Sequence, residues 1–310
     1  MRKTSSYDKK NAAALGLFDG VHKGHTAVFR DTVKAAEEAS LVPIAVTFRG
    51  TIAAHKNARL ILPEAQKIRH IKETGIKRIV TFCFDDIKSL SPEAFVKLLT
   101  EEYGVSHFVC GADFRFGINK SGGADTLKAL GEKLDFGVSI TPEMDENGEK
   151  ISSSRIREQI VAGNINEANR LLGYDFYYNL KVVEGCKIGR SMGFPTINQI
   201  IPKALVTPLY GVYLSETLIG GKAYKSLSNI GVKPTVDYKG KPLIETYIDG
   251  FDGDLYGEKI KVSLKEFIRN ERHFAGLAEL KKQLEDDKQF LLPVRAASRR
   301  PQYTKTYKKR

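Results

Sequence analysis

The first half of the chain alternates between two hydrophobic patterns. Short apolar runs predict strands, and the stretches between them carry apolar residues three and four positions apart, which predict helices. The runs that predict strands are residues 12–17, 42–48, 78–84, 106–110 and 137–141. The stretches that predict helices are residues 26–39, 64–73, 92–102, 125–133, 152–161 and 165–172. Because strands and helices alternate, we expect a parallel sheet covered by helices on both faces.

The pattern changes near Gly173, where helical periodicity gives way to short runs of alternating apolar and polar residues. Turn signals at residues 220–221, 239–240 and 252–253 separate several of these runs. The runs that predict strands are residues 177–183, 211–215, 222–228, 244–248 and 259–267. A final amphipathic helix is expected over residues 277–287. This arrangement is typical of a small antiparallel barrel.

Three segments follow from this change of pattern. We expect a first domain over residues 1–174, a second over residues 175–290, and a flexible basic tail over residues 291–310. Of 310 residues, 42% are hydrophobic and 28% charged, which is typical of a soluble globular protein. No apolar run is long enough to span a bilayer, so we expect no membrane association. The basic N-terminus with its short apolar stretch is a poor signal peptide.

The three cysteines bear on the cellular compartment of the protein, and the net charge bears on its partners. Cys83, Cys110 and Cys186 are widely spaced and form no CxxC pair, which favours a reducing, cytoplasmic compartment. The net charge of +12 lies mostly at the ends: the last twenty residues contribute seven charges and the first ten a net three. Basic ends exposed to solvent explain this distribution, and non-specific polyanion contact by the tail is the alternative. We expect no specific nucleic-acid partner, because the core is nearly neutral and lacks an RNA-binding aromatic motif.

Residues 16–25 place three glycines and two histidines between an apolar run and a predicted helix. A strand, a glycine-rich turn and a helix N-terminus form a site for a nucleotide phosphate, since backbone N–H groups and the helix dipole point at the anion. His22 and His25 add neutral or cationic donors where charge builds on phosphorus. A metal pair is the alternative for these histidines, but no third ligand is apparent nearby.

Two further segments of the first domain suit nucleotide chemistry. Asp113 and Arg115 follow an apolar strand, at the carboxyl end where ligands of parallel sheets bind. A second segment opens a predicted helix with hydroxyls between cations: Lys150, Ser152, Ser153, Ser154 and Arg155. Such a helix start suits a polyphosphate, although plain helix capping explains the serines equally well. Together with the two histidines, this segment favours nucleotidyl transfer.

The second domain carries a different set of polar residues. Thr196 and Asn198 are two apart and point to one side of an extended segment, where their oxygens suit Mg²⁺ with nucleotide phosphates. Glu245, at a strand start, could accept a proton from a substrate hydroxyl. A surface strand position is the alternative explanation for Glu245.

These segments, taken in order, resemble the bifunctional bacterial riboflavin kinase/FMN adenylyltransferase (FAD synthetase) family over roughly residues 12–288. The resemblance rests on GLFDGVHKGH at 16–25, GADFRFG at 111–117, ISSSRIRE at 151–158, GRSMGFPTIN at 189–198 with NIGVKPTV at 229–236, and ETYIDGFDGDLYG at 245–257 with FIRNERHF at 267–274. The ordered set is very specific, whereas any single motif is not.

The resemblance implies two ATP-dependent reactions on riboflavin and FMN. A Rossmann-like nucleotidylyltransferase domain with a parallel sheet would make FAD, and a six-stranded antiparallel β-barrel with a terminal helix would make FMN. It implies Glu245 as the kinase base, Thr196 and Asn198 as Mg²⁺ ligands, and His22, His25 and Lys150 as catalytic groups of adenylyl transfer. The nucleotide-binding residues implied are Gly16, Phe18, Asp19, Gly20, Gly24, Ser152, Ser153, Ser154, Arg155, Gly189, Gly193 and Pro195. The flavin-binding residues implied are Asp113, Phe114, Arg269, Glu271 and Phe274.

Two departures from the family pattern lie in the first domain. Members usually carry a small polar residue where Leu17 stands, and a Pro-His-Pro-like run where residues 49–53 read RGTIA. These departures motivate the alternative of a riboflavin kinase with a weak or inactive adenylyltransferase domain.

Overall fold

The structure is a computed structural model that describes residues 10–49, 59–185, 193–232 and 240–292. The chain divides into two compact units, Met1–Ser153 and Ser154–Arg310. Nearly all of the predicted basic tail lies outside the described residues, as do residues 50–53 of the run that departs from the family pattern. The expected assignment of residues 154–174 to the first domain stays a prediction.

A parallel sheet forms the centre of the first unit and confirms the predicted α/β fold. Its strands are β1 (Asn11–Leu15), β2 (Val42–Arg49), β3 (Arg78–Cys83), β4 (Val105–Gly111) and β5 (Gly137–Thr141). The order is β3-β2-β1-β4-β5 with every neighbour parallel, so the chain crosses over between β3 and β4. The carboxyl end of β1 therefore lies between those of β2 and β4, where ligands of such sheets bind.

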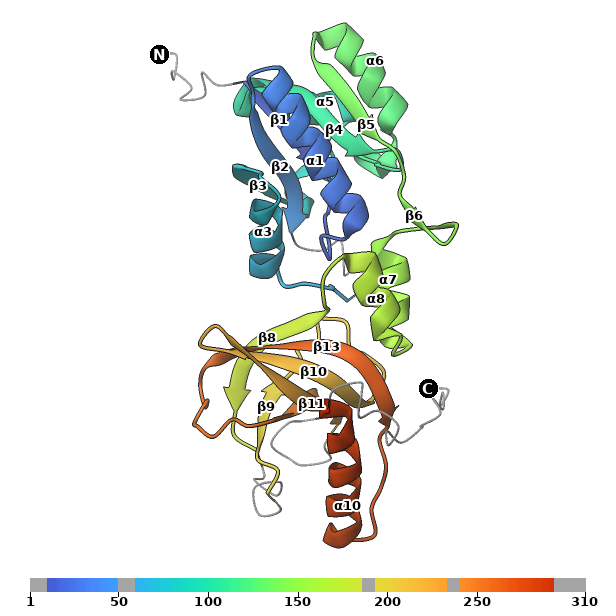
Figure 1. The fold of residues 1–310 in the computed structure, drawn as a ribbon. Coiled ribbons are helices and arrows are strands. Elements are labelled where there is room, and N and C mark those ends of the chain that lie inside the picture. Colours follow the sequence, from blue (N-terminus) through green and yellow to red (C-terminus); the bar gives the residue numbers. More distant parts are fainter. Residues whose placement is uncertain (1–9, 50–58, 186–192, 233–239, 293–310) are drawn as a thin grey trace. The chain divides into compact units, whose positions relative to one another are not determined.

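The central strand β1 is buried along its whole length, because helices cover both faces of the sheet. One face packs Ala13 and Leu15 with Phe95 and Leu99 of α5. Helix α1 covers the other face against β1, β2 and β4 (Figure 1). The helices are α1 (Lys23–Glu38), α3 (Glu64–Glu73), α4 (Phe84–Ile87), α5 (Pro92–Tyr103) and α6 (Ala124–Leu134), with a 3-10 turn η1 (Ile118–Lys120).

Helix α5 begins and ends as its sequence predicts. The Ser91 hydroxyl accepts a hydrogen bond from the Ala94 N–H at 3.1 Å, and Pro92 occupies the first turn. Gly104 ends the helix in the left-handed conformation. After β5 the chain forms a short hairpin that the sequence did not indicate, β6 (Asp145–Glu146) and β7 (Glu149–Lys150).

The second unit begins with two helices and continues as a closed barrel. The helices are α7 (Ser153–Val161) and α8 (Ile165–Leu172). The strands are β8 (Tyr177–Val183), β9 (Thr196–Ile200), β10 (Gly211–Ile219), β11 (Lys222–Val232), β12 (Pro242–Ile248) and β13 (Lys259–Asn270). They pair in the order β10-β11-β12-β9-β8-β13 and the barrel is closed (Figure 1). Six antiparallel strands confirm the expected barrel, and closure leaves no open sheet edge.

Side chains alternate across the barrel wall, and part of its interior is polar. Five hydroxyls bond to one another at 2.8–2.9 Å inside it, and all are at most 2% exposed: Ser215, Thr217, Ser226, Ser228 and Thr246. Because a hydroxyl can both donate and accept, four hydrogen bonds join the five groups in one chain, with Thr217 and Thr246 at its ends. Helix α10 (Leu277–Lys288) and the 3-10 turn η3 (Gln289–Leu291) follow β13, and η3 packs Phe290 against the outer wall.

Candidate active sites

The glycine-rich turn joins β1 to α1 and brings its two histidines into contact. His22 is the N-cap of α1, and its Nδ1 accepts a hydrogen bond from the His25 N–H at 3.4 Å. The two imidazole rings stack with centroids 3.6 Å apart and planes 20° from parallel. The structure therefore places both predicted histidines together at a helix N-terminus, a position that favours anions.

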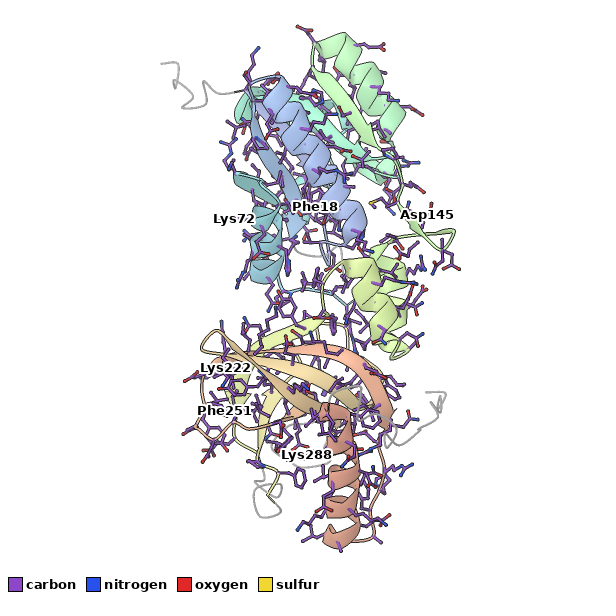
Figure 2. The ribbon with its side chains drawn as sticks, viewed as in Figure 1. Phe18, Lys72, Asp145, Lys222, Phe251 and Lys288 are labelled. Carbon is purple, nitrogen blue, oxygen red and sulfur yellow. The ribbon has the colours of Figure 1, made fainter. Side chains whose placement is uncertain are left out.

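The turn has a tightly packed interior that explains its glycines. Phe18, labelled in Figure 2, is 1% exposed and adopts a φ of 56°. Its ring meets the His25 ring edge-on, with the ring centroids 5.3 Å apart. A Cβ on Gly16 would lie 2.6 Å from the Phe18 ring. Gly20 has a φ of 80°, and a Cβ there would lie 2.9 Å from Ile61. Larger residues would displace the Phe18 ring at position 16 or the Ile61 side chain at position 20.

Burial sets the charge state of His25. Its Nδ1 is buried and has no hydrogen-bond partner among the described residues. Desolvation lowers the pKa of His25 well below its ordinary 6.5, and the nearby charges of His22 and Lys67 lower it further. His25 is therefore a neutral imidazole at physiological pH, which decides between the two charge states that the sequence left open.

A lysine that the sequence reasoning missed lies beneath the turn. Lys67 of α3 is 6% exposed, and its Nζ donates to the Leu17 carbonyl at 3.3 Å, the Thr47 hydroxyl at 3.2 Å and the Phe48 carbonyl at 3.1 Å. Burial lowers the pKa of Lys67, and the charges of Glu64 and Asp19 act in the opposite direction. The helical spacing of Lys67 and Ile71, which are both buried, is the signal that could have revealed it.

Lys150 and Asp113, predicted for different ligands, form an ion pair. The Lys150 Nζ lies 2.6 Å from Asp113 Oδ2 and 2.6 Å from Glu143 Oε1. These carboxylates raise the pKa of Lys150 against the opposing effect of desolvation. Phe114, next to Asp113, stacks on Phe116 with centroids 5.6 Å apart. Lys150 thus stays a cation, held by two acids that a bound phosphate would have to replace.

The serine-rich helix start divides between the two units. In the first unit, the Ser153 hydroxyl donates to the Asp19 carbonyl at 2.9 Å, which ties this segment to the glycine turn. In the second unit, the Arg155 guanidinium donates to Glu167 of α8 at 3.0 Å. Ser154 is exposed and Ser152 is half-buried. The nucleotide-binding roles of these residues stay predictions.

In the barrel unit, strand register assembles a row of polar residues on the outer wall. Asn198 of β9 pairs with Glu245 of β12, and Glu245 pairs with Asn229 of β11. Thr196 lies two residues before Asn198 and shares its face, opposite Tyr247 of β12. The residues predicted as base and metal ligands therefore lie on neighbouring strands, although they are far apart in sequence.

Asn198 has the features of a ligand. It is 4% exposed, and its Oδ1 is buried without a hydrogen-bond partner in the described part of the chain. A Cβ on Gly185 would lie 2.3 Å from the Asn198 amide nitrogen, so only glycine lets that side chain lie there. Phe194, which precedes the exposed Pro195, packs on Tyr247 with ring centroids 5.3 Å apart. Gly193 is described and has a φ of 83°, whereas Gly189 lies outside the described residues.

A second carboxylate lies beside this row. Glu271 Oε1 accepts a hydrogen bond from the Asn229 amide at 3.4 Å. A Cβ on Gly231 would lie 1.8 Å from the same oxygen, so the carboxylate lies directly over that strand. Desolvation raises the pKa of Glu271, and the charge of Glu245 adds to the effect against its polar neighbours. Phe274, also predicted near the flavin, is half-buried.

Arg269, predicted to bind flavin, is engaged inside the protein. Its guanidinium donates to both oxygens of Asp287 on α10 at 2.7–3.2 Å, and to the Asn270 carbonyl at 3.0 Å. Arg269 is 5% exposed and Asp287 1%. This buried pair joins β13 to α10, so Arg269 positions the segment that carries Glu271.

Comparisons with known proteins match both units. The family described as FAD synthetase matches residues 4–155, and the family described as riboflavin kinase matches residues 172–293. A bifunctional riboflavin kinase/FMN adenylyltransferase from Bacillus subtilis (strain 168) is 36% identical over 290 residues, covering 90% of this chain and 91% of that protein. One from Pseudomonas fluorescens is 33% identical over 280 residues, covering 89% and 90%. The chain belongs to the bifunctional riboflavin kinase/FMN adenylyltransferase family.

A solved structure agrees with this family's fold. It is described as a macrolide-efflux protein from Streptococcus pneumoniae and superposes with a TM-score of 0.83 at 31% identity, covering 92% of this chain and 95% of that one. In the ranges that the structure describes, no helix combines the length and apolar character needed to cross a membrane. Membership of the riboflavin kinase/FMN adenylyltransferase family confirms the resemblance drawn from the motifs, and it implies ATP and a divalent cation.

Proposed function

We propose that this protein phosphorylates riboflavin with ATP to give FMN, and then transfers AMP from a second ATP to FMN, giving FAD and pyrophosphate. Family membership carries the proposal, since both domains of the bifunctional enzymes are present. Two separate constellations of polar residues, one in each unit, support two reactions.

In the kinase reaction, Glu245 would take the proton from the ribityl 5′-hydroxyl as that oxygen attacks the γ-phosphorus of ATP, and ADP would leave. Its place between Asn198 and Asn229 supports this role, because two polar side chains flank the carboxylate on the same wall. Gly189, Gly193 and Pro195 remain the expected nucleotide contacts.

A divalent cation, which we propose to be Mg²⁺, would be held by Thr196 and Asn198. The donor set fits, because Asn198 offers a buried amide oxygen that has no other partner in the described residues. Amide and hydroxyl oxygens are ligands that Mg²⁺ accepts beside water and phosphate. When bound, the cation would neutralise charge on the phosphates.

In the adenylyl transfer, a phosphate oxygen of FMN attacks the α-phosphorus of ATP and pyrophosphate leaves. His22 and His25 would donate hydrogen bonds to the α-phosphate as its charge develops. The neutral state of His25 supports a role as hydrogen-bond donor rather than cation. Lys150 would hold the outgoing phosphates after leaving Asp113 and Glu143, and Asp113 and Phe114 would then face the flavin.

The alternative of an inactive adenylyltransferase domain gains no support. Leu17 departs from the family pattern, but the turn uses its carbonyl, which accepts from Thr47 at 2.9 Å and from Lys67. Any residue offers that carbonyl, so the leucine side chain leaves these bonds intact.

Location in the cytoplasm is part of the proposal. Cys83 and Cys110 are free thiols in the described structure, and desolvation raises the pKa of Cys110 to about 12. Unpaired cysteines suit a reducing compartment.

The deciding experiment incubates the purified chain with riboflavin, ATP and Mg²⁺ and separates the flavins over time. We expect FMN to appear first and FAD to follow. FMN without FAD would contradict adenylyl transfer, and the absence of FMN would contradict the kinase assignment. FMN supplied directly with ATP tests the second reaction alone.

A further inference from the structure

Helix α3 contains a buried cation to which the proposed function assigns no task. Lys67 is only 6% exposed, and lysine is among the residues least often buried. Taking an ammonium group out of water is costly unless hydrogen bonds replace its hydration. The position therefore needs an explanation beyond helix packing.

The contacts of Lys67 use every donor that its ammonium group has. Its three acceptors are the Leu17 carbonyl, the Thr47 hydroxyl and the Phe48 carbonyl. An ammonium carries three N–H donors and a neutral amine only two, so the charged form matches this set. Leu17 follows β1 and Phe48 lies near the end of β2, so the lysine joins two strand ends at the site edge of the sheet.

A second link attaches the start of α3 to the same turn. The Asp19 carboxylate, which is 2% exposed, accepts from the Ile61 N–H at 3.1 Å and the Leu62 N–H at 3.4 Å, shortly before α3 begins. Lys67 holds the turn on one side of Phe18 and Asp19 holds it on the other. Together they fix the backbone that holds Phe18 against the His25 ring.

We propose that Lys67 is a positioning residue for adenylyl transfer, which fixes the glycine turn and its stacked histidines by joining the ends of β1 and β2. The inference rests on the proposed adenylyl transfer. Lys67 has no donor left for a substrate while its three bonds persist, so it acts through the turn rather than on the phosphate.

The charge of Lys67 gives the inference a distinctive readout. The groups that act on His25 are the neighbouring imidazole of His22 and the ammonium of Lys67, and both lower the pKa of His25 in addition to desolvation. Asp19 and Glu64 are the acids whose charges act on Lys67 itself. Removing the ammonium takes away the smallest of the three effects that lower the pKa of His25, so this pKa should rise while desolvation still holds it below 6.5.

The test compares Lys67→Met with the wild-type chain and with Lys72→Met. Lys72 is an exposed lysine on the same helix (Figure 2) and serves as the matched control. We expect Lys67→Met to reduce kcat for FAD formation from FMN about 100-fold, because misplacement of reacting groups has effects of this size. Riboflavin phosphorylation by the same preparation should stay within twofold of wild type, and Lys72→Met should change neither reaction.

The pH profile separates positioning from a merely structural role. The acid limb of FAD formation should move to higher pH in Lys67→Met and stay in place in Lys67→Arg, which keeps the charge. Thr47→Val removes the hydroxyl that accepts from Lys67 and donates to the Leu17 carbonyl. It should reduce FAD formation about 25-fold, at about fivefold for each hydrogen bond.

Three results would overturn the inference: FAD formation within twofold of wild type in both Lys67→Met and Thr47→Val, equal loss of both reactions, or an unchanged acid limb in Lys67→Met. If Lys67→Met does not fold, Thr47→Val decides alone. If the wild-type chain forms no FAD, the proposed function is wrong. That result overturns the inference as well, because the inference rests on adenylyl transfer, whereas FAD formation that is equal in the wild-type chain and both variants overturns the inference alone.

Discussion

The two units build their sites in opposite ways. In the parallel-sheet unit, the histidines and glycines of one turn lie within ten consecutive residues, and β1 and α1 present them together. In the barrel unit, Asn198, Glu245 and Asn229 come from three strands and meet only because β9, β12 and β11 pair in one register. The first site depends on local backbone geometry, and the second depends on pairing across the sheet.

This difference predicts how each site fails. A substitution in the glycine turn should displace the neighbouring backbone and leave the unit folded. It should therefore impair FAD formation alone. A substitution that shifts the pairing of β9, β11 and β12, or that displaces α10, should affect all of the kinase residues together. The two reactions of one chain therefore serve as controls for each other.

The largest expected effect is the loss of riboflavin phosphorylation, the reaction assigned to the barrel, without loss of FAD formation from FMN. Glu245→Gln removes the proposed base, and we expect FMN formation to fall about 10³-fold or more, since general bases contribute 10²–10⁴-fold. FMN-to-FAD conversion should remain, as measured by flavin separation. Glu285→Gln, an exposed change on α10, is the matched control. An equal loss of both reactions would show that the two sites are not independent.

The next largest effect should come from a substitution that disrupts the contact of α10 with the barrel. Asp287→Ala leaves the Arg269 guanidinium buried without its partner, which should cost about 3–5 kcal/mol in unfolding free energy. Urea denaturation, followed by kinase activity and circular dichroism, measures it. Asp286→Ala changes the exposed neighbour and should have little effect. A denaturation midpoint equal to that of wild type would mean that α10 does not depend on the pair.

A substitution in the glycine turn should have the opposite selectivity to Glu245→Gln. His25→Ala should reduce FAD formation about 10²–10³-fold, the range seen when one donor to a developing charge is removed. FMN formation should not change. His70→Ala alters a histidine that lies beside Glu73 on α3 and is the control. Retention of FAD formation in His25→Ala would refute the assigned role.

A smaller effect should follow when a methyl group is added beside the row of polar residues on the barrel wall. Gly231→Ala places a methyl group where the Glu271 carboxylate lies, so the side chain must move away from Asn229. We expect kinase activity to fall about tenfold with FAD formation unchanged, because such shifts misplace reacting groups. Gly276→Ala, where a Cβ meets open space, is the control. Equal activity in both variants would exclude a role for Glu271 in the reaction.

The smallest effect concerns stability against pH in the first unit. The pKa of His25 is lower in the folded protein than its ordinary 6.5, so the unfolded chain binds the proton first as pH falls. Stability should therefore be constant above pH 7 and decline below about pH 6.5, by up to about 1.4 kcal/mol per pH unit. Urea denaturation at pH 7.5 and pH 5.5 measures the decline. His25→Gln should reduce the decline without removing it, because burial also lowers the pKa of His107 in the same unit. An undiminished decline would assign it to another group.

Much of both sites was predictable from short stretches of sequence. Residues 16–25 predicted a phosphate-binding turn, because glycine spacing, flanking hydrophobicity and helix start are local properties. Ser91 and Pro92 likewise predicted where α5 begins. The alternating pattern predicted a barrel, yet it did not reveal that Ser215, Ser226 and Ser228 would line the interior, because alternation alone does not say which side is inside.

Local pattern could not reveal the partners of the charged residues. Lys150 and Arg269 are predicted ligand contacts, and only the structure shows that they also pair with Asp113, Glu143 and Asp287. Lys67 looked like an ordinary helix residue. Hydrogen bonds and burial of this kind join positions far apart in the chain, so no short stretch of sequence contains them.

The order of the motifs was enough to determine the fold class and the family, and it predicted the residue types proposed to carry the chemistry. Tertiary structure alone decided that Glu245 lies between two asparagines, that His25 is neutral, and that a buried lysine lies under the glycine turn. The physical reason is that desolvation and register arise only when distant segments pack. The same side chain has a different charge, partner and role once its surroundings exclude water.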